Sequence, residues 1–325
     1  MSLRAAYDAY VTAALFDASG QGAFALGDGT VRFESGAVVE AHDGAILCAV
    51  QHPKGAGILT GGDDGRLMLT TPQGSTMMAQ VPGRWIECIT TSPATGLFAF
   101  GAGKDLHVRD ASDATFSRTF THERSVAGVS FEAKGRRLAV ATYGGAVLWY
   151  ARIADQKPVR FNWAGSHIVC EFSPDGKFLI SSMQESQLHG WRLSDAKDMR
   201  MGGYPSKIKS LAFLADGAYL ATAGAPGVVL WPFGGANGPM GKAATEIGFE
   251  DGTLVVRVAA APNQAVVAAG LDNGRVWVCH VARERTETLR DPGQAPISGL
   301  ALSGDAKRVA WGDESGAVGI DDVPF

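Results

Sequence analysis

The sequence repeats one pattern of apolar segments and turns along most of its length, and this repetition constrains the fold more than any other feature. The clearest copy runs from His167 to Trp191, HIVCEFSPDGKFLISSMQESQLHGW, with three apolar runs separated by a Ser-Pro-Asp-Gly turn and a polar turn. The same order recurs in segments that end near Trp149 and Trp231. The chain is therefore built from copies of one small structural unit.

Eight copies align, and their central turns are separated by about 41 residues on average. This period is typical of four-stranded sheets that pack radially around a centre. We number the copies as repeats one to eight in chain order. They begin near residues 11, 46, 86, 126, 167, 208, 255 and 297.

Each copy predicts four β-strands. Its apolar runs are separated by pairs such as Asp-Gly, Gly-Gly or Asn-Gly, which tolerate positive φ and close tight hairpins. A fourth, more polar run follows, such as TFSRTFTH, as expected of an outer strand with one face in water. We therefore expect an all-β single domain over residues 1–325, a β-propeller of eight four-stranded blades. Seven blades is the alternative, if the weak first or last copy is irregular.

The two ends of the chain are expected to share one sheet. The last copy ends at GIDDVPF, without room for an outer strand, and the N-terminal segment SLRAAYDAY precedes the first inner strand. Pairing this segment with the last copy would close the ring and remove an exposed sheet edge.

The repeat resembles that of the WD-repeat β-propeller family. In that family a Gly-His precedes the inner strand, a Ser or Thr lies in the second strand, an Asp in the second turn, and a Trp-Asp ends the third. His42, Thr60 and Asp64 match the first three features in repeat two, where Thr70 replaces the tryptophan. His122 matches in repeat four. The family tryptophan is present as Trp149, Trp191 and Trp231.

The strings WAGSH, SSMQESQLHGWRL, MRMGGYPSK and GPMGK also resemble a group of short bacterial WD-repeat proteins. That group is associated with zinc-homeostasis gene neighbourhoods and with a metal-chaperone GTPase. The resemblance implies such a GTPase as one partner.

The overall charge disfavours nucleic acid and membranes as partners. The formal net charge is -4 and the pI is near 6.0, so there is no general attraction to phosphates or anionic lipid. No apolar leader and no run of about 18 apolar residues occurs, so we expect a cytoplasmic protein, and we expect a monomer. The four cysteines lie in apolar runs without C-x-x-C spacing, which predicts free buried thiols.

No catalytic motif is present, and the sequence predicts a protein that is not an enzyme and needs no cofactor. The glycine-rich segment GGANGPMGKAA has Ala243 where a phosphate loop needs Ser or Thr. The seven histidines show no H-x-x-x-H or H-E-x-x-H spacing, so the sequence does not identify metal ligands.

His167 is the clearest departure from the repeat. Seven copies open their inner strand with valine or isoleucine, and the fifth opens with His167. Such departures concentrate at functional or strained positions. Because inner strands line the central channel, His167 is expected near the channel mouth. The alternative is a structural histidine whose ring bonds a neighbouring carbonyl.

Loops on that face carry aromatic, methionine and cationic residues, which are typical of recognition surfaces. We therefore predict a protein-interaction scaffold that binds through one face, centred on repeats four to six. A small-molecule or zinc site at the channel mouth, formed by His167, Glu185, Met183 and His122, is the alternative. The predicted contact residues are Arg84, Trp85, Lys104, His122, Arg124, Tyr143, Trp163, His167, Met183, Gln184, Glu185, Tyr204 and Lys207.

Overall fold

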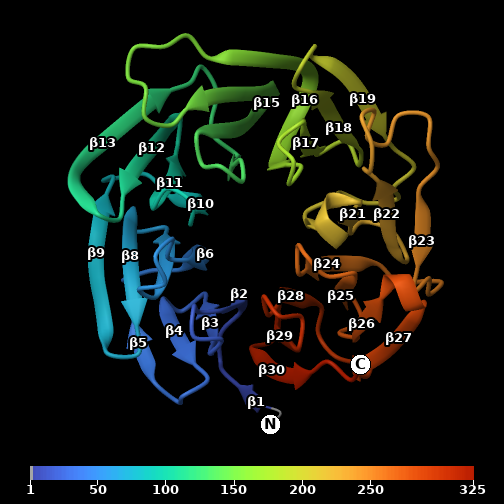
Figure 1. The fold of residues 1–325 in the computed structure, drawn as a ribbon. Helices are drawn as coiled ribbons and strands as arrows, with labels where there is room; N and C mark the ends of the chain where they lie inside the picture. The colour runs from blue at the N-terminus through green and yellow to red at the C-terminus, as the bar shows by residue number, and fades with distance from the viewer. Residues whose placement is uncertain (1–2) are drawn as a thin grey trace.

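The protein is a ring of antiparallel β-sheets around a central axis (Figure 1). The computed structural model describes residues 3–325, which form thirty β-strands and two short 3-10 helices, η1 (Ala215–Gly217) and η2 (Val281–Arg283). Within these residues the strands group into seven hydrogen-bonded sheets, six of four strands and one of six. The chain passes around the ring in sequence order, and the first strand of each repeat lies nearest the centre (Figure 1).

Five of the four-stranded sheets are each formed by consecutive strands. The first two are β2 (Val11–Phe16), β3 (Gly22–Leu26), β4 (Thr30–Phe33), β5 (Val38–Glu40), then β6 (Ile46–Gln51), β7 (Ile58–Gly62), β8 (Arg66–Thr71), β9 (Gly74–Gln80). The third is β10 (Ile86–Ser92), β11 (Leu97–Ala102), β12 (Asp105–Asp110), β13 (Asp113–Thr121). The remaining two are β20 (Leu211–Leu214), β21 (Tyr219–Thr222), β22 (Val228–Pro232), β23 (Thr245–Ile247), then β24 (Val255–Ala260), β25 (Val266–Leu271), β26 (Val276–His280), β27 (Arg285–Arg290).

The prediction of eight separate blades is wrong, because repeats four and five form one continuous sheet. Its strand β16 runs on from the outer strand of repeat four into the inner strand of repeat five. Ser166, at the expected break, pairs with Tyr143, and its carbonyl accepts the N–H of Gln184 (2.9 Å). The strands of this sheet are β14 (Gly128–Phe131), β15 (Arg137–Tyr150), β16 (Val159–Phe172), β17 (Phe178–Met183), β18 (Leu188–Arg192) and β19 (Lys197–Met201).

The core lies between sheet faces. Separate clusters of buried apolar side chains fill the contacts between neighbouring sheets, such as the one that joins Leu97 and Val108 to Leu138. One cluster fills the angle between the two halves of the six-stranded sheet, where Leu148 and Phe161 meet Leu179. Every apolar face is therefore covered by a neighbour, which is what a twisted sheet of this size needs.

Small residues on second strands let neighbouring sheets approach. A Cβ added at Gly61 would lie 2.5 Å from Ile86 Cγ2 of the next inner strand, and one at Gly270 would lie 2.4 Å from Ile297 Cγ2. A real Cβ cannot come so close to a packed side chain, so these positions need glycine. The β-branched residue that opens an inner strand thus packs onto the preceding sheet.

The predicted closure of the ring by the N-terminal strand is confirmed. Strand β1 (Leu3–Ala6) pairs antiparallel with β30 (Ala317–Asp322), in a sheet ordered β1-β30-β29-β28. The other members are β29 (Arg308–Asp313) and β28 (Ile297–Leu302). Both ends of the chain thus belong to one sheet, and the outer edge of β30 is covered.

Asp321 links the two ends of the chain through its side chain. One carboxylate oxygen accepts from Arg4 Nη2 at 2.5 Å, and the other accepts from Trp311 Nε1 at 2.8 Å. The Trp311 ring also lies between two guanidinium groups, with the Arg4 carbon 5.1 Å and the Arg290 carbon 4.3 Å from its centroid. A buried indole N–H without an acceptor is costly, so Asp321 stabilises the closing sheet.

The four cysteines are free thiols. Cys170 and Cys279 are buried as predicted, whereas Cys48 and Cys88 are partly buried. Burial raises the pKa of the Cys88 thiol to about 12, which makes a thiolate there unfavourable. Among residues 3–325, no helix is long and apolar enough to span a membrane.

We expect Asp321→Ala to lower the free energy of unfolding by about 1–3 kcal/mol, because it leaves the Trp311 N–H unpaired and removes the Arg4 ion pair. Urea denaturation measures this change. Asp251→Ala, which removes an exposed carboxylate in a loop, is the matched control and should change stability by less than about 0.5 kcal/mol. Equal effects of the two substitutions would contradict the role given to Asp321.

Candidate functional site

The two faces of the ring carry different loops. Strands alternate in direction, so the loops before inner strands and the loops between second and third strands lie on the same face, which we call the top face. These loops contact one another: the His122 N–H donates to the Lys104 carbonyl at 2.9 Å. The remaining turns and loops lie on the opposite face.

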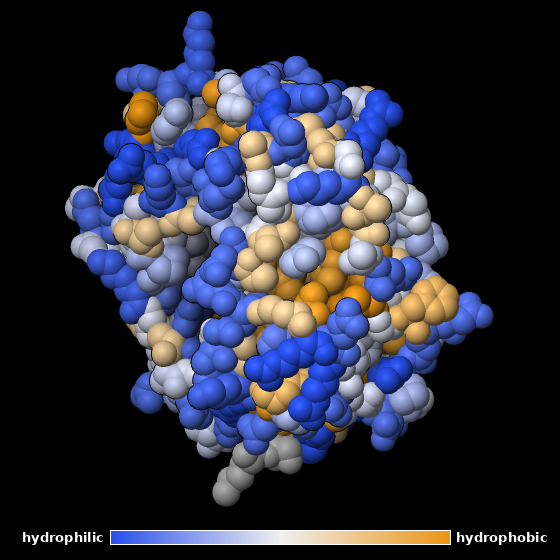
Figure 2. Space-filling view, turned by 45° about the vertical axis from the view of Figure 1, so that its right-hand side comes forward, coloured by the Kyte–Doolittle hydropathy of each residue, from blue (hydrophilic) through white to orange (hydrophobic). Residues whose placement is uncertain are grey.

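Large aromatic side chains project from the top face. Tyr143 is 63% exposed in the middle of β15, where the second strand of repeat four continues into the third. Trp85 and Phe249 are 59% and 62% exposed in loops before inner strands, and Tyr10 is also exposed in such a loop. Figure 2 shows that the surface of one side is largely hydrophilic around an apolar area near the centre of the view. Exposed aromatic residues set in a polar surface are typical of interaction sites.

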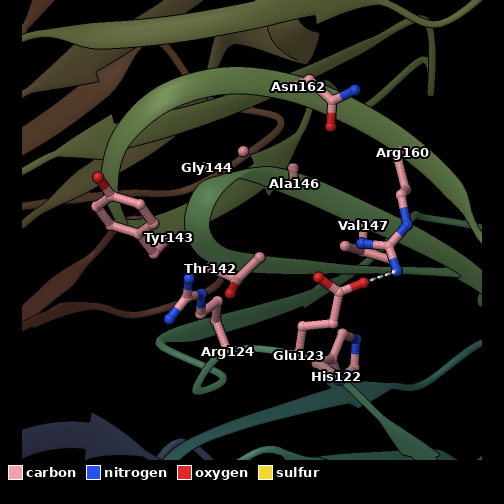
Figure 3. Close-up of a pocket in the computed structure, with 11 residues that line it drawn as sticks. His122, Glu123, Arg124, Thr142, Tyr143, Gly144, Ala146, Val147, Arg160 and Asn162 are labelled. Carbon is pink, nitrogen blue, oxygen red and sulfur yellow. Dashed lines mark hydrogen bonds and ion pairs between the residues drawn. The ribbon is translucent and has the colours of Figure 1, made fainter.

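A hollow of about 270 Å³ opens beside Tyr143 (Figure 3). Arg124 and Tyr143 lie on one side of it, with the guanidinium carbon 5.9 Å from the ring centroid. Glu123 and Arg160 lie on the other side as an exposed ion pair at 3.2 Å. The buried hydroxyl of Thr142, between them, has no hydrogen-bond partner among the described residues. The hollow thus offers an aromatic face and cations.

Two glycines follow Tyr143 at an irregularity within β15. The register of the β15–β16 pairing shifts between Tyr143 and Gly145. Gly144 and Gly145 have φ of +92° and +140°, and a Cβ at Gly145 would lie 2.0 Å from the Phe161 carbonyl oxygen. Only glycine fits where the hairpin crosses this closely over the outer strand. Tyr143 lies at this irregularity of the strand, and its side chain is exposed.

His122 is a structural residue of repeat four. Its Nε2 accepts the indole N–H of Trp149 at 3.0 Å, and its Nδ1–H donates to the Lys104 carbonyl at 3.2 Å. These two bonds require the neutral ring. Burial lowers the His122 pKa, which agrees with that state.

His167 is also a structural residue. The sequence analysis gave this as the alternative interpretation. It is 1% exposed, so its side chain lies between sheets and not on a surface. Its Nε2–H donates to the Trp163 carbonyl at 3.0 Å, and its Nδ1 lies 2.6 Å from Ser181 Oγ. Burial lowers its pKa and favours the neutral ring.

Tyr204 and Met183 are buried as well. The Tyr204 hydroxyl accepts the indole N–H of Trp231 at 2.6 Å and lies 2.6 Å from Thr222 Oγ1. The side chains of His122, His167, Met183 and Tyr204 are therefore buried, although His122 also lines the hollow beside Tyr143. Their role as contact residues stays a prediction.

Trp163 is half-buried between two side chains. Its ring stacks on His189 with centroids 4.0 Å apart, and the Arg200 guanidinium carbon lies 4.1 Å from the indole centroid. Most of the ring is therefore used within the protein, and only its remaining edge is available to a partner.

Eight predicted contact residues are exposed on the top face. Arg124 and Tyr143 are brought together at the hollow, and Arg84 lies beside Gly103, next to Lys104. The Glu185 carboxylate accepts the Ser166 N–H at 3.2 Å, so this side chain also holds its turn. The exposed set is Arg84, Trp85, Lys104, Arg124, Tyr143, Gln184, Glu185 and Lys207.

The sequence interpretation did not include several residues that the structure places on this face. Tyr10 and Phe249 lie in loops before inner strands, and the positional argument that identified Trp85 applies equally to them. Glu123, Arg160 and Thr142 line the hollow. No sequence spacing predicts that these three residues lie close together, because their proximity depends on the pairing of β15 with β16.

The predicted metal alternative finds no support in the structure. Among residues 3–325, no group of three or more His, Cys, Asp or Glu side chains is arranged to hold a metal ion. His122 and His167 use both ring nitrogens in separate hydrogen-bond networks. Burial raises the pKa of the Glu171 carboxyl to about 7, and this carboxyl accepts a hydrogen bond from the Ser130 hydroxyl at 3.4 Å.

Residues 34–70 match the family model described as "WD domain, G-beta repeat". The chain carries a WD repeat and has the fold of WD-repeat β-propellers. The resemblance predicted from sequence is thereby confirmed, while its association with zinc homeostasis stays a prediction. No curated protein matches the sequence.

Several solved structures resemble the chain in fold. The computationally designed Ika8 protein has 16% identity and a TM-score of 0.77, with 98% of each chain covered. The structure of U3-55K has 17% identity and a TM-score of 0.64, covering 87% of this chain and 97% of that one. The RRP9 WD40 repeats have 17% identity and a TM-score of 0.63, covering 87% and 95%. At these identities the likeness shows the fold alone.

The WD repeat at residues 34–70 forms most of the hydrogen-bond set that the resemblance implies. His42 Nε2 lies 2.9 Å from Thr60 Oγ1, and His42 Nδ1 lies 3.0 Å from Asp64 Oδ1. Thr70 stands in the tryptophan position, and its buried hydroxyl has no partner among the described residues. Other repeats form a corresponding hydrogen-bond set with different residues. In repeat six Tyr204 takes the place of the histidine.

We expect Tyr204→Phe to lower the free energy of unfolding by about 1–3 kcal/mol, because the partly buried Trp231 N–H loses its acceptor and the buried Thr222 hydroxyl loses its partner. Thermal denaturation measures the change. Tyr150→Phe, whose hydroxyl lies on an exposed residue of the opposite face, is the matched control and should have little effect. A stability unchanged by Tyr204→Phe would show that the hydroxyl is not a structural acceptor.

Proposed function

We propose that this protein is a non-catalytic interaction scaffold, a single domain of 325 residues that works as a cytoplasmic monomer and binds a protein partner through its top face. The observation that carries the proposal is the hollow beside Tyr143, where an exposed aromatic ring and the Arg124 cation lie together. Such a combination supplies contact area and charge from one place on the surface.

The surface around the hollow extends into repeat three. Arg84, Lys104 and Arg124 are exposed, and none of them makes an ion pair among the described residues. Trp85 stands beside Arg84. Unpaired cations next to exposed aromatic rings favour a partner with an acidic, partly apolar surface.

The fold supports this proposal without specifying the partner. WD-repeat propellers generally bind protein partners, and rigid sheets hold their loops in place so that little ordering is needed on binding. Fold alone does not identify a function, so the argument rests on the surface residues. The resemblance to zinc-associated bacterial proteins makes a metal-chaperone GTPase one partner to include in the test.

The test is affinity capture of the tagged full chain from its own cells, with quantitative mass spectrometry. We expect Arg124→Glu and Tyr143→Ala each to reduce the recovery of a specific partner at least tenfold, because each removes a central contact. The purified GTPase is tested in parallel by titration.

Tyr150→Ala is the matched control, because it removes an exposed tyrosine from the opposite face. It should leave recovery of the partner unchanged. Recovery that is lost with Tyr150→Ala, or kept with both top-face variants, would refute the assignment of the contact face.

A further inference from the structure

Arg257 departs from the repeat at the third position of the inner strands. In the other seven repeats a small or medium-sized residue occupies this position: Ala13, Cys48, Cys88, Gly128, Val169, Ser210 and Gly299. Repeat seven alone places a long cation there. A departure of this kind, in a position that packing restricts, marks a candidate functional site.

The side chains at this position are small because inner strands approach one another closely. A Cβ at Gly128 would lie 2.7 Å from the Ile168 carbonyl oxygen, and one at Gly299 would lie 2.7 Å from the Ala14 nitrogen. Arg257 extends toward the next inner strand, where its Nε donates to the Ser298 carbonyl at 2.7 Å. The guanidinium is thus held at the junction of repeats seven and eight.

The Arg257 cation is mostly buried without a carboxylate partner. Its Nη1 donates to the Val256 carbonyl at 3.1 Å, and its Nη2 has no hydrogen-bond partner among the described residues. Burial lowers its pKa, and it makes no ion pair within residues 3–325. Charges removed from water are normally paired. This guanidinium bonds no carboxylate among the described residues, and the one nearby counter-charge is Glu314, which acts to raise the Arg257 pKa against the effect of burial.

Arg257 lines a pocket of about 160 Å³ on the top face, at the inner ends of repeats six, seven, eight and one. Lys207 and Lys209 also line it, and neither side chain makes a hydrogen bond or ion pair among the described residues. Glu314 is the one carboxylate in the lining, and Tyr10 adds an aromatic wall. Three cations therefore face one carboxylate in a small cavity.

We propose that this pocket binds a single oxyanion, a carboxylate or a phosphate group, with the guanidinium of Arg257 as its central partner. The free Nη2 edge supplies charge-assisted hydrogen bonds, and the two lysines supply further positive charge at the rim. The pocket volume suits one such group. The proposal uses different residues from the hollow beside Tyr143, so either one can fail without the other.

The source of the oxyanion is distinguished by two probes, measured by calorimetric titration of the full chain at constant ionic strength. Inorganic phosphate represents a free or protein-borne phosphate. A capped Gly-Glu-Gly peptide represents a side-chain carboxylate on a partner, with Gly-Gln-Gly as its neutral counterpart. We expect saturable binding of at least one probe and no binding of the glutamine peptide.

Arg257→Gln should weaken that binding at least tenfold, and Lys209→Gln, a substitution of an exposed residue, about threefold or more. Arg283→Gln is the matched control, since it removes an exposed arginine from η2 outside the pocket and should leave affinity unchanged. If Arg257→Gln does not fold, the affinity of Lys209→Gln for the probe still tests the proposal. Binding of neither probe, or equal affinity in the pocket and control variants, would overturn the proposal.

Discussion

The structure depends on covering both faces of every sheet. A single twisted four-stranded sheet leaves two apolar faces open, and in this protein each face is buried against the next sheet around the ring. This arrangement holds only if the ring closes. Strand β1 closes it by pairing with β30, and Asp321 connects Arg4 of the first strand to Trp311 of the last sheet.

Within the ring, several repeats hold their loops with different buried hydrogen-bond sets. Repeat two uses His42 with Thr60 and Asp64, and repeat four uses His122 with Trp149. Each set joins the loop before an inner strand to a neighbouring strand of the same sheet. In these two repeats the residues that hold the top-face loops are buried and differ from the residues that the loops expose, so substitutions there can separate stability from binding.

Much of the fold could be predicted from the sequence, because apolar runs and Gly-containing turns recur with one period. The number of sheets could not be predicted, because it depends on the hydrogen bonds of Ser166, where the chain stays extended between two repeats. Prediction of the site was less successful. His167 departs from the repeat but is buried and bonded, whereas Arg257 departs in the same way and faces a cavity. A departure from a repeat shows that a position has a different environment from its counterparts. Only the surrounding atoms show whether the side chain there is structural or accessible.

The central functional claim is that the top face around Tyr143 is the contact surface. Hydroxyl-radical footprinting of the free protein and of the complex isolated from cells tests it residue by residue. Oxidation of Tyr143 and Trp85 should fall at least severalfold in the complex, because their exposed rings become covered, while Tyr150 on the opposite face should react as before. Protection of Tyr150 with unchanged oxidation of Tyr143 would contradict the account.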